Sequence, residues 1–259
     1  LRHAITLRGF DYQSRFDNLI QQVAQKEKKV VILIDEYDKP IIDNLEEIET
    51  AVAVRDVLRN FYGVIKASDR YLRFVFITGI SKFSKVGVFS ALNNLDDLSM
   101  APQFATALGI TEEELRSNFQ EHIADFASQR AMTPEDLVAE IRRWYNGFCF
   151  VEESPPVYNP FSTLQLFTKQ RFSNYWFETG TPTFLIKLLK TQQFDITELN
   201  DLRLRELGFS TYELESLAIV PLLFQTGYLT IKGYEPQRRV YTLAYPNMEV
   251  EDAFLTFLL

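Results

Sequence analysis

The chain has 259 residues, of which 46% are hydrophobic and 24% charged, and this composition predicts a folded protein with a large core. The net charge of −8 argues against broad non-specific binding to nucleic acid, although not against a local basic patch. One cysteine excludes an internal disulfide, and two distant histidines argue against a zinc site. No apolar run reaches membrane-spanning length, so we expect a cytoplasmic protein without membrane contact.

The first predicted elements are a helix and a buried strand. Apolar side chains recur at helical spacing between residues 11 and 25, which predicts a helix with one apolar face. Val30 to Ile34 form an unbroken aliphatic run, which is typical of a strand buried on both faces of a parallel sheet. Pro40 follows and predicts a turn at residues 38–40, because proline disfavours helix in the residue before it.

Two carboxylates, Asp35 and Glu36, come directly after this strand. Open α/β sheets bind their ligands at the carboxyl ends of the strands. A carboxylate there can hold Mg²⁺, directly or through water, and its neighbour can orient or deprotonate an attacking water. This is the pattern of the Walker B element of P-loop NTPases. The alternative is a strand that ends in a solvated acidic turn.

A second strand is predicted to bring a hydroxyl group to the same edge. A long helix at residues 45–67 precedes an apolar run at 71–77, and the order strand, helix, strand predicts a parallel pair. Thr78 is the first polar residue after this run, where it would hold the attacking water or contact the γ-phosphate of a nucleotide. The alternative is a threonine that caps the next turn, with Gly79 supplying a permissive backbone.

The phosphate-binding element of such enzymes is missing from the sequence. Its pattern is G-x-x-x-x-G-K-[ST], in which backbone N–H groups and the lysine hold the phosphates. No glycine in this chain is followed by lysine, and the strand that precedes such a loop is absent too. We therefore expect either a fragment that lacks the P-loop or a protein that does not bind nucleotide.

Several blocks of the sequence, taken together, resemble the AAA-ATPase-like domain family of bacterial proteins. The blocks are Ile34 to Ile41, Phe76 to Ser84, Phe89 to Leu95, Trp144 to Phe148, Val157 to Ser162 and Tyr175 to Pro182. Each block alone is weak, but the ordered set runs through nearly the whole chain and is quite specific. Members of this family usually carry an N-terminal P-loop, and many are fused to a PD-(D/E)XK nuclease-like domain.

The resemblance implies a role for three residues. Asp35 matches the magnesium ligand at the nucleotide, Glu36 the catalytic glutamate, and Thr78 the sensor that contacts the nucleotide and serves catalysis. It also implies a P-loop NTPase-like (AAA-type) α/β core that binds and hydrolyses ATP with Mg²⁺ in the full-length protein. An isolated fragment without Walker A would be inactive. The macromolecular substrate and the question of a homo-oligomer stay open.

The second part of the sequence, residues 101–192, is predicted to be an α-helical, lid-like region after an α/β core at 1–100. Thr111 and Glu114 form a capping-box signature for a helix that extends to about residue 129. Pro134 stands at the first position of another helix.

The last part, residues 193–259, is predicted to be a winged-helix-like unit. A helix at 211–224 and two strands at 227–231 and 239–243 lead to a closing helix at 247–259. Basic side chains gather at the hairpin tip, where a wing could touch DNA phosphates: Lys232, Arg238 and Arg239. The second hypothesis is therefore a non-catalytic regulatory module that binds DNA or a protein through this unit. The alternative is an ordinary solvated hairpin tip.

Overall fold

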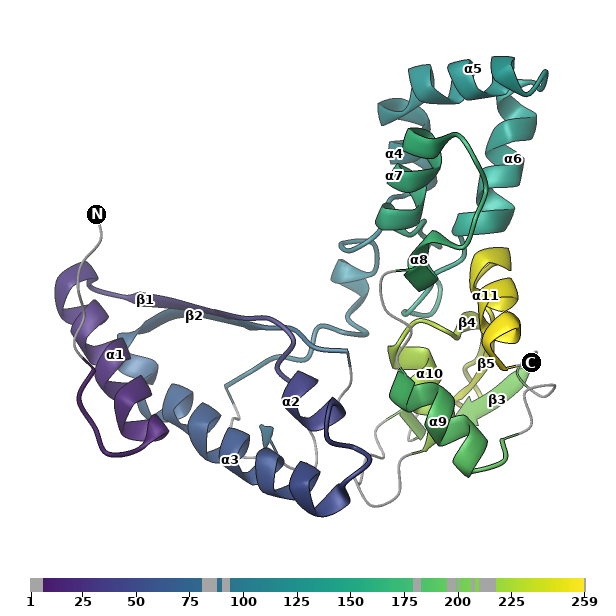
Figure 1. The fold of residues 1–259 in the computed structure, drawn as a ribbon. Coiled ribbons are helices and arrows are strands. Elements are labelled where there is room, and N and C mark those ends of the chain that lie inside the picture. The colour runs from purple at the N-terminus through teal and green to yellow at the C-terminus, as the bar shows by residue number, and fades with distance from the viewer. Residues whose placement is uncertain are drawn as a thin grey trace. The chain divides into compact units, whose positions relative to one another are not determined.

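The computed structural model describes residues 7–80, 88–89, 94–178, 183–194, 199, 201–205, 208–209 and 218–258. The chain divides into two compact units, each described by itself below (Figure 1). The first is Leu1–Asp96 with Ser210–Ala218, and the second is Asp97–Phe209 with Ile219–Leu259. The division of the chain at residues 100 and 192 stays a prediction.

The first unit contains the predicted strand–helix–strand arrangement. Its elements are α1 (Tyr12–Glu27), β1 (Val30–Ile34), α2 (Lys39–Ile42), α3 (Ile48–Ala67), a 3-10 turn at Asp69–Tyr71 and β2 (Leu72–Ile77). The strands β1 and β2 pair in parallel, with Ile34 opposite Ile77 at their carboxyl ends. The mixed α/β class and the parallel pair are thus confirmed.

Helices α1 and α3 of this unit pack against each other. The rings of Phe16 and Phe61 stack with their centroids 4.5 Å apart, and Ile20 and Ile65 are buried. The hydroxyl of Ser68, at the end of α3, donates to the Asp17 carboxylate at 2.9 Å. These contacts fix the helix that leads into β1 against the helix that leads into β2.

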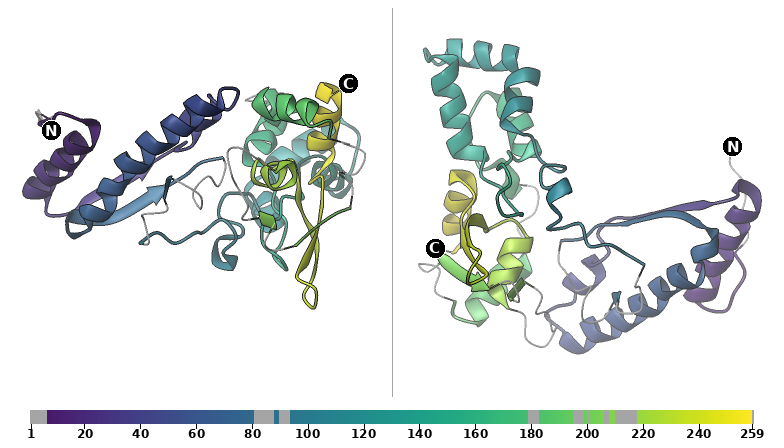
Figure 2. Two further views of the ribbon diagram at one scale, coloured as in Figure 1. Left: turned by 90° about the horizontal axis from the view of Figure 1, so that it is seen from below. Right: turned by 180° about the vertical axis from the view of Figure 1, so that it is seen from behind.

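The expectation that the first strand is buried on both faces is wrong for the described residues. Ile32 is buried, whereas Val31 and Leu33 are 50% and 70% exposed. Their partners Phe74 and Phe76 on β2 are 54% and 42% exposed, so the four side chains form one apolar face. The reason is that α1, α2 and α3 lie on the other side of the two strands (Figure 1; Figure 2, right).

The turn expected at residues 38–40 is instead the start of helix α2, which begins at Lys39. Proline lacks an N–H group, but the first turn of a helix does not need one, so Pro40 is tolerated there. The rule that proline disfavours helix in the preceding residue is overridden locally.

The second unit begins with helices. They are α4 (Glu112–Asn118), α5 (Gln120–Gln129), α6 (Pro134–Tyr145), α7 (Pro160–Lys169), α8 (Tyr175–Glu178) and α9 (Thr183–Thr191), preceded by a 3-10 turn at Pro102–Phe104. The capping box of Thr111 and Glu114 is confirmed in both directions. The single helix expected over 111–129 is wrong, because the chain breaks at Phe119 between α4 and α5.

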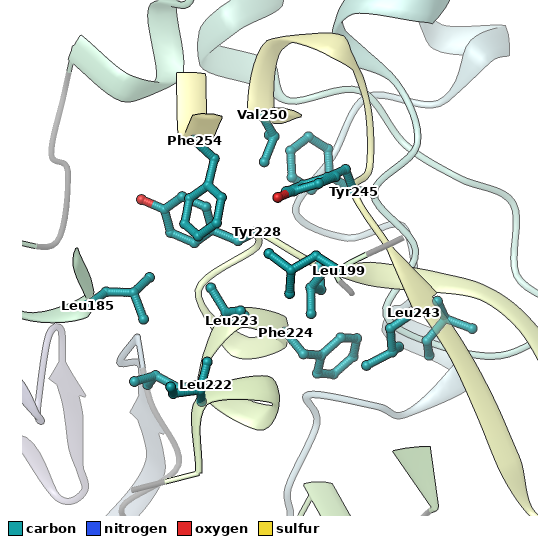
Figure 3. Packing of buried hydrophobic residues seen from close by; sticks show 14 of the residues in the cluster. Leu185, Leu199, Leu222, Leu223, Phe224, Tyr228, Leu243, Tyr245, Val250 and Phe254 are labelled. Carbon is teal, nitrogen blue, oxygen red and sulfur yellow. The ribbon is translucent and has the colours of Figure 1, made fainter. Parts of the chain in front are cut away.

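The same unit also contains an antiparallel sheet. Its elements are β3 (Leu202–Arg205), α10 (Ile219–Gln225), β4 (Thr230–Glu235), β5 (Val240–Ala244) and α11 (Met248–Leu258), with strand order β3-β5-β4. The predicted hairpin and closing helix are confirmed, and β3 was not predicted. Of the helix expected at 211–224, residues 211–217 lie outside the described residues. Apolar side chains from α10, the strands and α11 pack together, among them Leu222, Leu243 and Phe254 (Figure 3).

A buried carboxylate joins the helices to α11. Glu249 is fully buried, and its Oε1 accepts hydrogen bonds from the Ser162 hydroxyl and from the backbone N–H of Trp176, both at 2.9 Å. Burial of a polar group is unfavourable, and hydrogen bonds to that group offset the cost. Glu249 therefore holds α7, α8 and the start of α11 together.

Among the helices of the described residues, none combines the length and the apolar composition that a membrane span needs.

A partly buried ion-pair network stabilises the helices of this unit. Glu112 accepts hydrogen bonds from Arg142 at 2.7 Å, from Arg116 at 2.8 Å and from the Tyr158 hydroxyl at 2.6 Å. Burial alone would raise the pKa of Glu112, but the bonds from Arg142, Tyr158 and Arg116 outweigh it and lower the pKa to about 2. The ionised carboxylate thus ties α4 to α6.

This lowered pKa predicts how the stability of the unit depends on pH. A carboxyl whose pKa is lower in the folded state stabilises fully above its ordinary value of 4.5, and loses this effect as the pH falls towards 2. We expect Glu112→Gln to cost about 1–2 kcal/mol at pH 7, since Glu112 is one-third exposed and solvent screens its pairs. Denaturant titrations from pH 7 to pH 2 should show a flatter profile for the variant, and parallel profiles would contradict the network.

Candidate functional site

The candidate site lies where β1 and β2 end. The backbone N–H of Thr78 donates to the carbonyl of Ile34 at 2.8 Å, which continues the parallel ladder by one residue. The N–H of Tyr37 then donates to the carbonyl of Thr78 at 3.0 Å. The two loops that follow the strands are therefore joined through their backbones, and Asp35 and Thr78 lie at the same edge of the sheet.

The side chains of these two residues are in direct contact. The Thr78 hydroxyl donates to Oδ1 of Asp35, and the same oxygen accepts the backbone N–H of Glu36 at 3.0 Å. Asp35 is exposed and Thr78 is partly buried. The contact orients the Asp35 carboxylate, whose second oxygen is the kind of ligand that a hard divalent cation prefers.

Glu36 has an unusual backbone conformation. Its φ is +50°, in the left-handed region that residues other than glycine, asparagine and aspartate seldom adopt. Such a conformation costs free energy, and it persists where surrounding contacts fix it. Here the carbonyl of Glu36 accepts the N–H of Lys39 at 3.1 Å, at the start of α2. The chain therefore turns sharply at Glu36 and leaves its carboxylate exposed beside Asp35.

Gly79 does not have the role that the alternative interpretation of Thr78 gave it, a permissive backbone. Its φ does not lie in the left-handed region, so a permissive backbone is not what the position needs. A Cβ atom there would stand 2.6 Å from the ring of Tyr37 and 2.7 Å from Oδ1 of Asp38. Both neighbours are buried, so neither can move away freely. Gly79 allows the two loops to approach closely.

Asp38 is a member of this site that the sequence reasoning treated as a turn residue. Its side chain is fully buried, and its Oδ1 accepts the backbone N–H of Ile80 at 3.2 Å. Nothing in the sequence separates Asp38 from an ordinary acidic turn residue, because its partner lies 42 positions away.

Of the three basic residues predicted at the hairpin tip, Arg238 and Arg239 lie in the turn between β4 and β5, whereas Lys232 does not. Lys232 belongs to β4, its ammonium group donates to the carbonyl of Pro246 at 2.9 Å, and desolvation of that group lowers its pKa. Arg238 and Arg203 both approach Glu235, at 3.5 and 3.9 Å. A partner for this unit stays a prediction.

The fold and the site together describe a mixed α/β protein with an acid–hydroxyl pair at the ends of two parallel strands. Residues 3–89, which contain this site, match the family model AAA-ATPase-like, described as a predicted AAA-ATPase. The resemblance of this part of the sequence is thereby confirmed.

A longer similarity links the chain to a protein from Azotobacter chroococcum mcd 1, described as an uncharacterized protein in the vnfD 5′ region. The two are 44% identical over 245 residues, which are 92% of this chain and 45% of the relative. The chain thus spans about half the length of that relative. No solved structure matches the chain.

Proposed function

We propose that the ends of β1 and β2 form part of an ATP-hydrolysing site of the AAA type in the full-length protein. The observation that carries the proposal is the contact between the Asp35 carboxylate and the Thr78 hydroxyl at one edge of a parallel sheet. Ligands of open parallel sheets bind at this edge. The family match of residues 3–89 supports nucleotide chemistry there.

Asp35 would hold Mg²⁺ directly or through water. Within the described residues, no group of three or more His, Cys, Asp or Glu side chains could hold a metal ion. A single carboxylate fits magnesium bound to a nucleotide, because that ion keeps several waters and takes its other ligands from phosphates. When bound, the ion would neutralise charge on the phosphates.

Glu36 and Thr78 would act on the attacking water. Glu36 follows the magnesium ligand directly and is exposed, so it can accept a proton from water. The Thr78 hydroxyl is fixed by Asp35 on one side, and its oxygen can in addition accept a hydrogen bond from that water. The phosphate-binding loop would come from outside these 259 residues.

The exposed apolar face of β1 and β2 supports the finer fold proposal, a P-loop NTPase-like sheet. Parallel sheets occur almost only with both faces covered, and two strands alone are marginally stable. Further layers of such a core would bury the apolar face formed by Val31, Leu33, Phe74 and Phe76.

The experiment that tests the proposed function compares ATP turnover by the full-length protein with turnover by its Glu36→Gln variant.

A further inference from the structure

The side chain of Asp38 makes an atypical contact for a residue at the start of a helix. Asp38 is the N-cap of α2, a position where aspartate ordinarily accepts an N–H from the first helical turn. Here it makes no such bond. Pro40 offers no N–H, and the N–H groups of Ile41 and Ile42 donate to the backbone carbonyl of Asp38, both at 2.9 Å. The carboxylate therefore takes a partner outside α2.

That partner is the loop after β2. Oδ1 of Asp38 accepts the N–H of Ile80, two residues beyond Thr78. The same oxygen lies against Gly79, where a Cβ would be 2.7 Å away. The carboxylate thus contacts the backbone that follows Thr78. The N–H of Thr78 itself donates to the carbonyl of Ile34, and this bond fixes the backbone on the other side of the residue.

The surroundings of the carboxylate hold it in this place. The rings of Tyr37 and of Tyr62 from α3 both pack on the ring of Phe89, with centroid distances of 4.7 and 5.4 Å. Burial and the negative charge of Asp38 both raise the pKa of Tyr62, which indicates that α3 lies close to this carboxylate. Asp38 is fully buried, and burial of a carboxylate is unfavourable unless hydrogen bonds compensate for it, so the bond from Ile80 helps to stabilise the carboxylate there.

We propose that Asp38 is a positioning residue, which clamps the backbone at Ile80 so that the Thr78 hydroxyl stays on Asp35. The clamp uses an acceptor oxygen rather than the negative charge. Its catalytic consequence rests on the proposed function, because it requires Thr78 to act in ATP hydrolysis. Misplacement of such a group by about 1 Å costs up to roughly 100-fold in rate.

The test uses three variants of the full-length protein. Asp38→Ala removes the acceptor, Asp38→Asn keeps an acceptor oxygen of the same shape, and Asp43→Ala is the matched control. Asp43 lies at the other end of α2, is exposed and pairs with Lys39. Should Asp38→Ala fail to fold, Asp38→Leu removes the acceptor while filling the space.

Hydrogen exchange of the Ile80 amide measures directly how well the bond to Asp38 protects that amide, and it does not depend on activity. We expect exchange about tenfold faster in Asp38→Ala, since the hydrogen bond that protects this amide is lost, and near-normal exchange in Asp38→Asn, which keeps an acceptor oxygen. Unchanged exchange in Asp38→Ala, or no recovery in Asp38→Asn, would overturn the clamp.

Steady-state kinetics measure the effect of the clamp on ATP hydrolysis. We expect kcat to fall about 10- to 100-fold in Asp38→Ala with KM for ATP within about threefold, and to recover largely in Asp38→Asn. A merely structural role would lower the amount of active protein in both variants alike, and that result would contradict positioning. A wild-type protein without turnover would refute the proposed function, while the exchange experiment would still decide the clamp.

Discussion

Replacing Glu36 by glutamine in the full-length protein should lower ATP turnover by about 100- to 10,000-fold, the usual contribution of a general base. Glutamine has nearly the same size and keeps the hydrogen-bonding oxygen, but it cannot accept the proton of the attacking water. ATP binding should stay within about threefold of the wild type, because Asp35 and Thr78 are unchanged. Phosphate release measures the first quantity and calorimetry the second.

The matched control is Glu49→Gln. Glu49 is an exposed glutamate in the first turn of α3, so the substitution removes the same charge from the same unit. We expect its turnover within about twofold of the wild type. If Glu36→Gln hydrolyses ATP at the control's rate, Glu36 does not activate the water and its assignment is wrong.

Adding a single methyl group at Gly79 should disturb the whole site. The new Cβ of Gly79→Ala would overlap the buried ring of Tyr37 and the buried carboxylate of Asp38. Overpacking of this kind costs about 1–3 kcal/mol and shifts the backbone. Because that shift would move Thr78 away from Asp35, we expect turnover to fall at least about tenfold as well.

Gly63→Ala provides the opposite expectation with the same chemical change. Gly63 lies within α3, and no atom comes within 4 Å of a Cβ built there. Alanine in a helix is favoured over glycine by about 0.5–1 kcal/mol, so this variant should be slightly more stable than the wild type. Denaturant unfolding of both variants tests whether Gly79→Ala lowers, and Gly63→Ala raises, the free energy of unfolding. Equal stability of the two alanine variants would show that Gly79 is not sterically required.

The meeting of Asp35 and Thr78 could be predicted from the sequence because it follows from topology. A strand, a long helix and a second strand give a parallel pair, and parallel pairing brings both carboxyl ends to one edge. The caps were equally accessible: Thr111 with Glu114 is a local pattern that needs no knowledge of distant residues.

Features that depend on distant partners could not be predicted in this way. The Ile80 contact that makes Asp38 a member of the site comes from another loop. The sequence predicts Lys232 at the hairpin tip, but its bond to Pro246 depends on how β5 leads into α11. At Gly79, the ring of Tyr37 from the neighbouring loop is what excludes a side chain, and no local pattern around Gly79 indicates it.

The exposed face of the sheet shows a different limit of sequence reasoning. An aliphatic run such as Val30 to Ile34 indicates burial on both sides, but it does not say what covers each side. In the described residues, the helices cover one side only, and Leu33 on the other is 70% exposed. The apolar pattern is therefore consistent with a larger sheet in the full-length protein, which the proposed function requires.

The most direct test of the ATP site is a structure of the full-length protein with Mg²⁺ and a non-hydrolysable ATP analogue. We predict that Asp35 binds the ion, directly or through one water, and that the γ-phosphate lies beside Thr78 with Glu36 facing it. A nucleotide bound far from both strand ends, with Asp35 and Thr78 in contact only with each other, would contradict the account.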